Sequence, residues 1–401
     1  MRKRPWPERP LSECAKFLSG GTPRKSRAEF WEGDIPWVSS GEMTQTRIYD
    51  ATLHITPDAA EVGSRLVPEI TILAVVRGMS LAKEFRVSIT KREVAFNQDL
   101  KALACKPDVD PVFLFYSLFA QRESIRQSAT EASHGTKKLE TDTLGRVKIP
   151  LPQIQIQKRA AEVASVYDDT MENNRRRMGL LEKAARLLYE EWFVRLRFPG
   201  HEHTPVKNGL PEGWERKRLD ELVEVNRASL PGNHDGEIEY VDISSVAPGE
   251  ITETKVLEFR DAPSRARRIV QHGDIIWSCV RPNRRSHAVI WNPPENLIVS
   301  TGFAVLTPKA AQTSFIYYAS STDAFVGYLE NHAKGAAYPA VVAGDFERAR
   351  IVMPPSRLLQ AFDETVEPIF SQIHNLHRQN QKLRAARDLL LPRLMSGEIE
   401  V

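Results

Sequence analysis

Two stretches of the chain decide its fold, and the spacing of their side chains predicts a long helix in each. Residues 160–192 read AAEVASVYDDTMENNRRRMGLLEKAARLLYEEW, and residues 362–394 read FDETVEPIFSQIHNLHRQNQKLRAARDLLLPRL. In both stretches one series of positions recurs in alternating steps of four and three, which is the seven-residue repeat of a coiled coil. An offset of 202 residues maps one core series onto the other. The series are Ala160, Ala164, Tyr167, Met171, Asn174, Met178, Leu181, Ala185, Leu188 and Trp192, and Phe362, Val366, Ile369, Ile373, Leu376, Asn380, Leu383, Arg387, Leu390 and Leu394.

The two series fit together if the helices run antiparallel. When paired positions sum to 554, every core position meets a core position, and Asn174 faces Asn380, the only amides in either series. A buried amide pair is costly unless it is satisfied, and its best-known use is to fix register. We therefore expect Asn174 and Asn380 to set the helix–helix register, with solvated amides as the alternative. Pro368 is expected to kink the second helix or to start its regular part, and Pro392 to end it.

The regions that precede the two helices repeat each other. Leu73–Arg77 matches Trp277–Arg281 at an offset of 204 residues, and Asn97–Leu103 matches Ser300–Leu306 at 203. Ile149–Pro152 matches Val352–Pro355, again at 203. Because the matches keep their order and nearly the same offset, the sequence indicates a tandem duplication of units about 200 residues long.

Each unit begins with short apolar runs broken by Gly, Pro and Asn, which predict strands with a few helices. The sequence therefore predicts a mixed α/β (α+β) fold, in which two duplicated globular domains are joined by two long antiparallel coiled-coil helices. The expected boundaries are a first domain at 1–152, a helix at 153–197, a linker at 198–213, a second domain at 214–355, and a second helix with the C-terminal tail at 356–401.

Composition and motifs exclude several classes of protein. No apolar run approaches 18 residues, so no membrane span is predicted, and the N-terminus lacks the apolar region of a secretory signal. Cys14, Cys105 and Cys279 lie too far apart to suggest a disulfide framework or a zinc site, so we expect a reduced, cytoplasmic protein. The chain has no phosphate-binding G-x-x-x-x-G-K-[ST] loop, no G-x-S-x-G elbow and no H-E-x-x-H pair. We therefore predict no catalytic residue and no metal site.

Duplex DNA is the partner that suits a duplicated chain, because two-fold proteins match half-sites at a fixed spacing. Net charge is only +3, but residues 264–287 hold six arginines and one acid, Asp274. Arg can bridge phosphates or bind guanine at two points, and Asn can read adenine. The alternative is a solvated, salt-bridged loop. The candidate DNA-binding residues are Arg281, Asn283, Arg284, Arg285, Ser286, His287 and Tyr338 in the second unit, and Thr22, Arg24, Lys25, Arg27, Arg77, Lys137 and Lys138 in the first.

One motif suggests an enzyme but is incomplete. Asn292-Pro293-Pro294-Glu295 resembles the Asn-Pro-Pro-aromatic motif of adenine-N6 methyltransferases, in which the aromatic ring stacks on a flipped base. Glu295 cannot stack, and no Gly-rich turn for S-adenosylmethionine precedes it. We therefore predict a turn that connects two strands.

Several short motifs together resemble the specificity subunits of type I restriction–modification systems. They are Gly20–Pro23 with Phe30–Val38, Leu210–Trp214 through Leu219, Gly273–Pro282, and the tail Leu391–Glu398. The resemblance covers nearly the whole chain. The second unit departs from it, because Leu230-Pro231-Gly232 is its nearest counterpart of Gly-Gly-Thr-Pro.

The resemblance implies a non-catalytic subunit of a prokaryotic cytoplasmic complex. It would bind a split DNA target, with one half-site for each recognition domain. It would also recruit two modification subunits, which methylate adenine, and restriction subunits with ATPase and endonuclease activity. S-adenosylmethionine, ATP and Mg would be bound by those partners, and no cofactor by this chain. The alternatives are a single-chain DNA methyltransferase and a coiled-coil interaction scaffold that never binds DNA.

Overall fold

The computed structural model describes residues 6–132 and 135–400, and the chain divides into two compact units. Unit 1 comprises Met1–Asn173 and Gln379–Val401, and unit 2 comprises Asn174–Arg378. Each unit contains one globular domain and part of both long helices. We call the domain before the first long helix head 1 and the domain between the two long helices head 2. Over the described residues, no helix has the length and apolar character needed to cross a bilayer.

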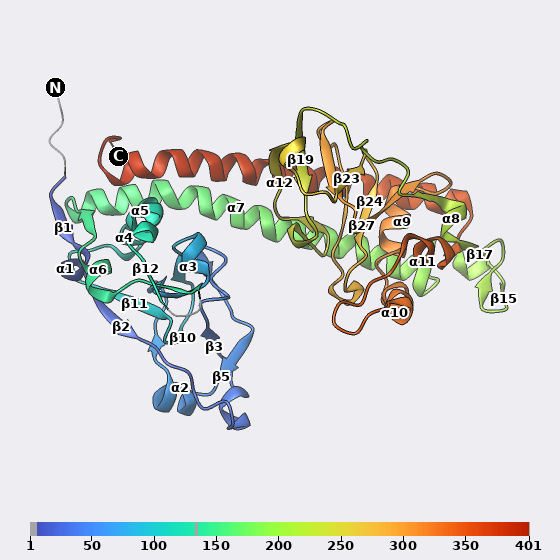
Figure 1. Cartoon of the computed structure of the whole chain (residues 1–401). Coiled ribbons are helices and arrows are strands. Elements are labelled where there is room, and N and C mark those ends of the chain that lie inside the picture. The colour runs from blue at the N-terminus through green and yellow to red at the C-terminus, as the bar shows by residue number, and fades with distance from the viewer. Residues whose placement is uncertain (1–5, 133–134, 401) are drawn as a thin grey trace. The chain divides into compact units, whose positions relative to one another are not determined.

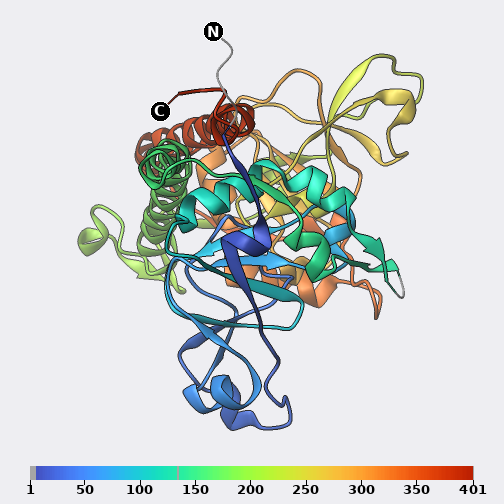
Figure 2. The same cartoon turned by 90° about the vertical axis from the view of Figure 1, so that its left-hand side faces the viewer.

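The two predicted long helices are present as α7 (Ile154–Tyr189) and α12 (Ser356–Met395) (Figure 1). All twenty core positions predicted from the sequence are buried or half-buried. In unit 1, Ala160 and Ala164 share an apolar cluster with Leu391 and Leu394. In unit 2, the ring of Tyr189 lies 6.0 Å from that of Phe362. Low residue numbers on one helix thus meet high numbers on the other, so the helices are antiparallel as predicted, and Figure 2 shows them side by side.

Both prolines of α12 lie inside the helix, so Pro392 does not act as predicted, whereas a kink at Pro368 stays a prediction. The helix is continuous from Ser356 to Met395, so Pro368 does not start it and Pro392 does not end it. Both proline side chains are exposed, while Leu391 and Leu394 beside Pro392 are fully buried. Packing of the apolar face therefore outweighs the backbone hydrogen bond that each proline removes.

The polar positions between the helices are buried. Asn174 and Asn380 are 4% and 9% exposed, and Asn380 donates a hydrogen bond from Nδ2 to the Met171 carbonyl at 3.3 Å. That these two amides face each other stays a prediction. In unit 1 the Arg387 guanidinium lies 2.5 Å from the Asp168 carboxylate. Asp168 is buried and Tyr167, the predicted core residue, is only half-buried, because the buried Arg387 needs an anionic partner.

Head 1 contains two main sheets. The four-stranded sheet has the order β5 (Leu53–Ile55), β3 (Ile35–Val38), β10 (Val94–Phe96) and β6 (Leu66–Val67). The five-stranded sheet has the order β2 (Ala15–Ser19), β11 (Leu100–Cys105), β7 (Ile72–Val75), β9 (Val87–Thr90) and β4 (Arg47–Ile48). A further pair joins β1 (Glu8–Pro10) to β14 (Lys148–Pro150).

Head 2 repeats this strand order, except that its second sheet has four strands where that of head 1 has five. Its first sheet has the order β22 (Lys255–Glu258), β19 (Glu237–Val241), β26 (Leu297–Ser300) and β23 (Ala266–Ile269). Its second sheet has the order β18 (Val223–Val225), β27 (Phe303–Pro308), β24 (Ile275–Ser278) and β25 (His287–Val289). A further pair joins β17 (Glu215–Arg218) to β28 (Arg350–Met353). The parallel pair β3–β10 corresponds to β19–β26. The sequence matches fall on corresponding strands, β7 with β24, β11 with β27 and β14 with β28, so the duplication is confirmed in the fold.

The remaining α-helices and strands are short and connect or cover these sheets. In head 1 they are α1 (Leu11–Cys14), α2 (Pro57–Gly63), β8 (Arg77–Gly78), α3 (Ser80–Lys83), α4 (Pro111–Ala120), α5 (Arg122–Gln127), β12 (Thr130–Glu131), β13 (Lys137–Lys138) and α6 (Thr141–Gly145). In unit 2 they are β15 (Val206–Lys207), β16 (Leu210–Pro211), α8 (Leu219–Leu222), β20 (Val246–Ala247), β21 (Glu250–Ile251), α9 (Thr313–Ala319), α10 (Asp323–His332) and α11 (Ala343–Arg348). The predicted linker at 198–213 thus contains the hairpin β15–β16.

Candidate nucleic-acid interface

The arginine-rich loop of head 2 is a tight connection between two buried strands. Strands β24 and β25 pair antiparallel, and the 3-10 helix η7 (Pro282–Arg284) lies between them. Pro282 is buried and anchors the loop, whereas Asn283 and Arg284 are exposed at its tip. Arg281 and Arg285 adopt left-handed backbone conformations, with φ of 52° and 54°, which are uncommon for side chains of their size. The loop is therefore a fixed structure that presents basic side chains.

The loop lines a hollow of about 380 Å³ in head 2. Four of the predicted residues, Arg281, Arg284, Ser286 and Tyr338, lie in its wall. Tyr338 comes from the α10–α11 connection, more than 50 residues further along the chain. The structure thus brings together residues that the sequence placed in two separate segments.

The side chains of Arg281 and Arg285 are engaged within the protein. Arg281 donates from Nη2 to the Ala337 carbonyl at 3.1 Å, and its guanidinium carbon lies 4.6 Å from the centre of the Tyr338 ring. Arg285 forms an ion pair of 2.5 Å with Asp323, the first residue of α10. Both side chains of that pair are solvent-accessible, so the pair is weak and can exchange for a phosphate. Arg284 is left as the exposed cation of the loop.

His287 does not lie on the surface, although the sequence placed it among the DNA contacts. Its side chain is buried and stacks on Trp277, with ring centres 4.7 Å apart and planes 7° from parallel. Nδ1 donates to the Arg285 carbonyl at 2.6 Å, which holds the left-handed turn in place. Burial lowers the pKa of His287 to about 4, so the ring is neutral at pH 7. His287 therefore supports the loop from below and cannot contact DNA in this conformation.

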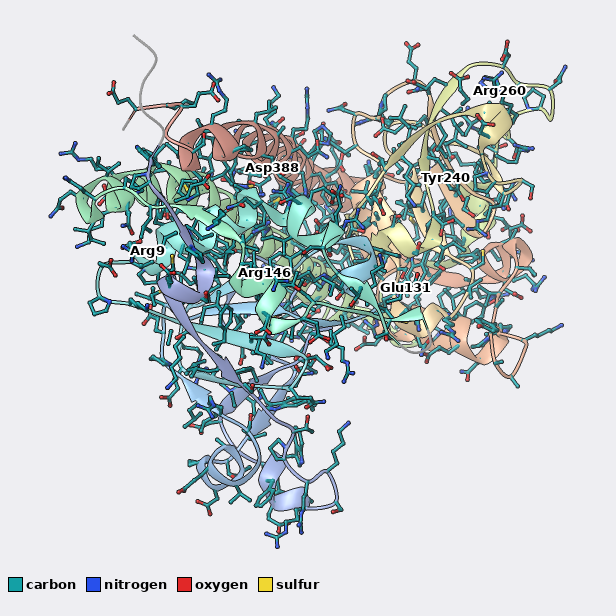
Figure 3. The ribbon with its side chains drawn as sticks, turned by 60° about the vertical axis from the view of Figure 1, so that its left-hand side comes forward. Arg9, Glu131, Arg146, Tyr240, Arg260 and Asp388 are labelled. Atoms are coloured by element: carbon teal, nitrogen blue, oxygen red, sulfur yellow. The ribbon has the colours of Figure 1, made fainter. Side chains whose placement is uncertain are left out.

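The sequence missed one acidic residue of the hollow, Asp242, which directly follows β19. Burial by itself would raise the pKa of Asp242, but hydrogen bonds from the Ser244 backbone N–H and the Arg265 guanidinium hold it at about 2. The Arg265 Nη2–Asp242 Oδ2 distance is 2.6 Å, so the charge of Asp242 is compensated. Tyr240 donates from its hydroxyl to the same carboxylate at 3.0 Å and is labelled in Figure 3. No sequence motif marks Asp242, because the basic residues of the hollow, Arg281 and Arg284, belong to a different segment of the chain.

In head 1 the structure brings three predicted basic residues together. Arg77 lies on β8, which pairs with β13, and Lys138 is its register partner while Lys137 is opposite Gly78. Arg77 is exposed, and Lys138 forms an ion pair with Glu140 at 2.7 Å. On the other side β13 pairs with β12, whose Glu131 is labelled in Figure 3. Strand β8 of this small sheet follows β7 in the chain, as the arginine-rich loop of head 2 follows β24.

The loop with Thr22, Arg24, Lys25 and Arg27 is separate from that sheet and is partly structural. The Thr22 hydroxyl donates to Gln98 at 2.7 Å, and the Trp37 indole donates to the Gly21 carbonyl at 3.0 Å. Arg24, Lys25 and Arg27 are exposed, and the Arg27 guanidinium lies over the Phe30 ring. Head 1 also has a smaller hollow of about 250 Å³ beyond the end of β3, which no sequence signal indicated. Its lining includes Glu42, Gln45, Arg47 and Tyr49.

The methyltransferase-like motif connects strands, as predicted. Asn292–Glu295 lies between β25 and β26, and the Leu297 N–H donates to the Pro294 carbonyl at 3.1 Å. Asn292 has a left-handed conformation, with φ of 46°, and its backbone N–H donates to His272. The motif thus forms a turn.

Comparisons with known proteins agree with the duplicated architecture. A family model described as the type I restriction modification DNA specificity domain matches residues 3–183. The type I restriction enzyme MjaIX specificity subunit of Methanocaldococcus jannaschii is 26% identical over 415 aligned residues, which cover 99% of this chain and 94% of that protein. The EcoR124I/EcoR124II specificity subunit of Escherichia coli is 30% identical over 160 residues, 39% of this chain and 40% of that protein. In a crystal structure, the type I restriction–modification S subunit from M. genitalium has the same fold, with a TM-score of 0.57 and 17% identity over 97% of this chain and 96% of that one.

Proposed function

Because the chain belongs to the specificity-subunit family of type I restriction–modification systems, we propose that it binds a bipartite DNA target, with one half-site for each head. The subunit is itself non-catalytic. In this proposal it positions two modification subunits, which use S-adenosylmethionine to methylate adenine, and restriction subunits, which use ATP and Mg.

The observation that carries the proposal is the repeated strand order with dissimilar basic loops at the same place. In head 2 the segment after β24 presents Arg284 and Asn283 beside a hollow, and in head 1 the segment after β7 presents Arg77 opposite Lys138. The scaffold is thus shared, while the side chains that would meet base edges differ. Two different half-sites follow, since base contacts specify sequence and phosphate contacts fix position.

The test is selection of DNA by the full chain from a duplex pool of random sequence, followed by mobility shifts at several salt concentrations. We expect two short conserved blocks separated by a gap of fixed length and no conserved sequence. Affinity should fall steeply with salt, because bound phosphates release their counterions. Failure to select a split motif would contradict the proposal.

A matched pair of variants locates the contact in head 2. Arg284→Ala should weaken binding and reduce the salt slope by about one if Arg284 contacts a phosphate. Arg260→Ala removes another exposed arginine of head 2, which does not line the hollow, and this variant should bind as the original chain does. Equal losses for the two variants would indicate a general charge effect rather than a contact at the hollow.

The same protein and DNA samples also test the two alternative functions. Methyl transfer to DNA by this chain alone, with S-adenosylmethionine and without partners, would identify a methyltransferase. Absence of any salt-sensitive DNA binding would identify a scaffold that acts only through its helices.

A further inference from the structure

The connection between α10 and α11 in head 2 is a rigid loop with one large side chain at its tip. Lys334 and Ala340 exchange two backbone hydrogen bonds of 2.9 Å, which close the loop on itself. The loop is also fixed to the arginine-rich segment, because the Arg281 N–H donates to the Pro339 carbonyl at 2.7 Å and the Val341 N–H donates to the Cys279 carbonyl at 2.9 Å. A loop held in this way loses little conformational entropy when it binds a partner.

Tyr338 is the large side chain, and it is presented to solvent. It is 69% exposed, and its neighbours in the chain, Gly335, Ala336, Ala337 and Pro339, are all small, so they do not prevent close approach to the ring. The Arg281 guanidinium lies over its ring at 4.6 Å, and the same side chain holds the Ala337 carbonyl. One side of the ring therefore contacts the Arg281 guanidinium, and the rest of the ring is open to solvent.

We propose that Tyr338 inserts at a base step of the half-site bound by head 2 and stacks on a base. Arg281 is then the positioning residue that holds the ring, rather than a residue that reads a base. This inference rests on the proposed function. Side chains inserted between base pairs unstack a step and bend the duplex, and aromatic rings stack on any base because every base has a π face. Arg284 and Ser286, which share the hollow with Tyr338, are placed to contact the backbone beside the inserted ring.

Insertion would be confined to one half-site. In the corresponding connection of head 1 the Leu139 N–H donates to the Val76 carbonyl, as the Val341 N–H donates to the Cys279 carbonyl in head 2, and the residues before Leu139 are Gly135, Thr136, Lys137 and Lys138, with no aromatic ring among them. Lysines bind phosphates but do not stack as an aromatic ring does. The two half-sites should therefore be distorted to different extents.

The experiment uses the full chain and the split duplex that it selects, with 2-aminopurine placed at successive positions of each half-site. With the original chain we expect the fluorescence to change at one base step of one half-site, because insertion of the ring replaces the stacking of 2-aminopurine on its neighbouring base. Tyr338→Phe should keep that signal, and Tyr338→Ala should abolish it and weaken binding about tenfold. Val342→Ala, which shortens an equally exposed side chain of the same segment, should change neither.

A second duplex tests insertion directly. An abasic site at the responsive position removes the need to unstack a base, so it should reduce the difference in affinity between Tyr338→Ala and the original chain. If Tyr338→Ala keeps the fluorescence signal and binds within twofold of the original chain, insertion is wrong. If the original chain selects no split duplex, it is the proposed function that fails.

Arg281→Lys separates positioning from base reading. Lysine keeps the charge but cannot cover the ring and hold the Ala337 carbonyl with the same planar group. We expect a smaller fluorescence signal, an unchanged salt slope and the same selected sequence. A changed sequence with an undiminished signal would show that Arg281 reads a base, and would overturn its role as a positioning residue.

Discussion

Replacing Asp168 with Asn should destabilise unit 1 more than any change to its surface charges. The Arg387 Nη1–Asp168 Oδ1 distance is 2.5 Å, and the two side chains are only 6% and 3% exposed. Tyr116 donates its hydroxyl to the other carboxylate oxygen at 2.9 Å, so α4 of head 1 is joined to both long helices at this point. An Asn side chain can still accept from Tyr116, but it leaves the buried charge of Arg387 without its main partner.

The size of the effect follows from what Arg387 retains. Removing one member of a buried ion pair typically costs about 3–5 kcal/mol. Arg387 keeps a contact of 2.9 Å with Asp388, which is labelled in Figure 3, and its guanidinium lies 4.7 Å from the centre of the Phe119 ring. Since Asp388 is partly solvated and also binds Arg122, we expect the lower end of that range, about 3 kcal/mol.

The assay is urea unfolding of the full chain, with hydrogen exchange of α4 and the first half of α7 as the local measure for unit 1. Asp108→Asn breaks the exposed pair with Arg9 and is the control, with little expected effect on the unfolding midpoint because exposed ion pairs contribute little to stability. The double variant Asp168→Leu with Arg387→Met should recover most of the loss, because apolar side chains replace a buried ion pair at little cost. A loss below about 1 kcal/mol for Asp168→Asn, or strictly additive losses in the double variant, would refute this reasoning.

Three further changes have predicted directions. The folded pKa of His287, about 4, lies below its ordinary value of 6.5, so the unfolded chain binds a proton that the folded chain does not. The free energy of unfolding of unit 2 should therefore fall by up to about 3 kcal/mol as the pH falls from about 6.5 to about 4. In thermal unfolding, His287→Gln should flatten this pH dependence, and the control His203→Gln should not. Gly21→Ala should destabilise unit 1 by about 2 kcal/mol in urea, because the new Cβ would lie 2.5 Å from the Gly63 carbonyl oxygen, and an unchanged midpoint would contradict the close approach. Pro368→Ala should stabilise unit 2 by about 2 kcal/mol, since the exposed proline lies inside α12. Protection from hydrogen exchange of the new amide at residue 368 would show the hydrogen bond that it donates to the Glu364 carbonyl.

The amino-acid sequence alone determined the long helices, their antiparallel packing and the duplication of the heads. These features depend on periodicity and on spacing along the chain, which are present in the sequence whatever the rest of the fold does. The alternating steps of four and three residues identified which face of α7 and α12 is buried. The nearly constant offset matched β7 of head 1 with β24 of head 2. The expectation that Pro392 ends α12 came from a local rule about proline, and packing of the apolar face of the helix outweighs that rule.

Only the tertiary structure decided which polar groups are partners and which are free. The sequence grouped Arg281, Arg284, Arg285 and His287 as equivalent contacts, but the fold buries His287 under the loop, joins Arg281 to Tyr338 and pairs Arg285 with Asp323. It also buries Asp168, which lies outside the predicted core series, as an ion-pair partner of Arg387. The reason is that the energy of a charged or aromatic group depends on what lies within a few ångströms of it. Those neighbours come from segments 38 to more than 200 residues away, where no local pattern can indicate them.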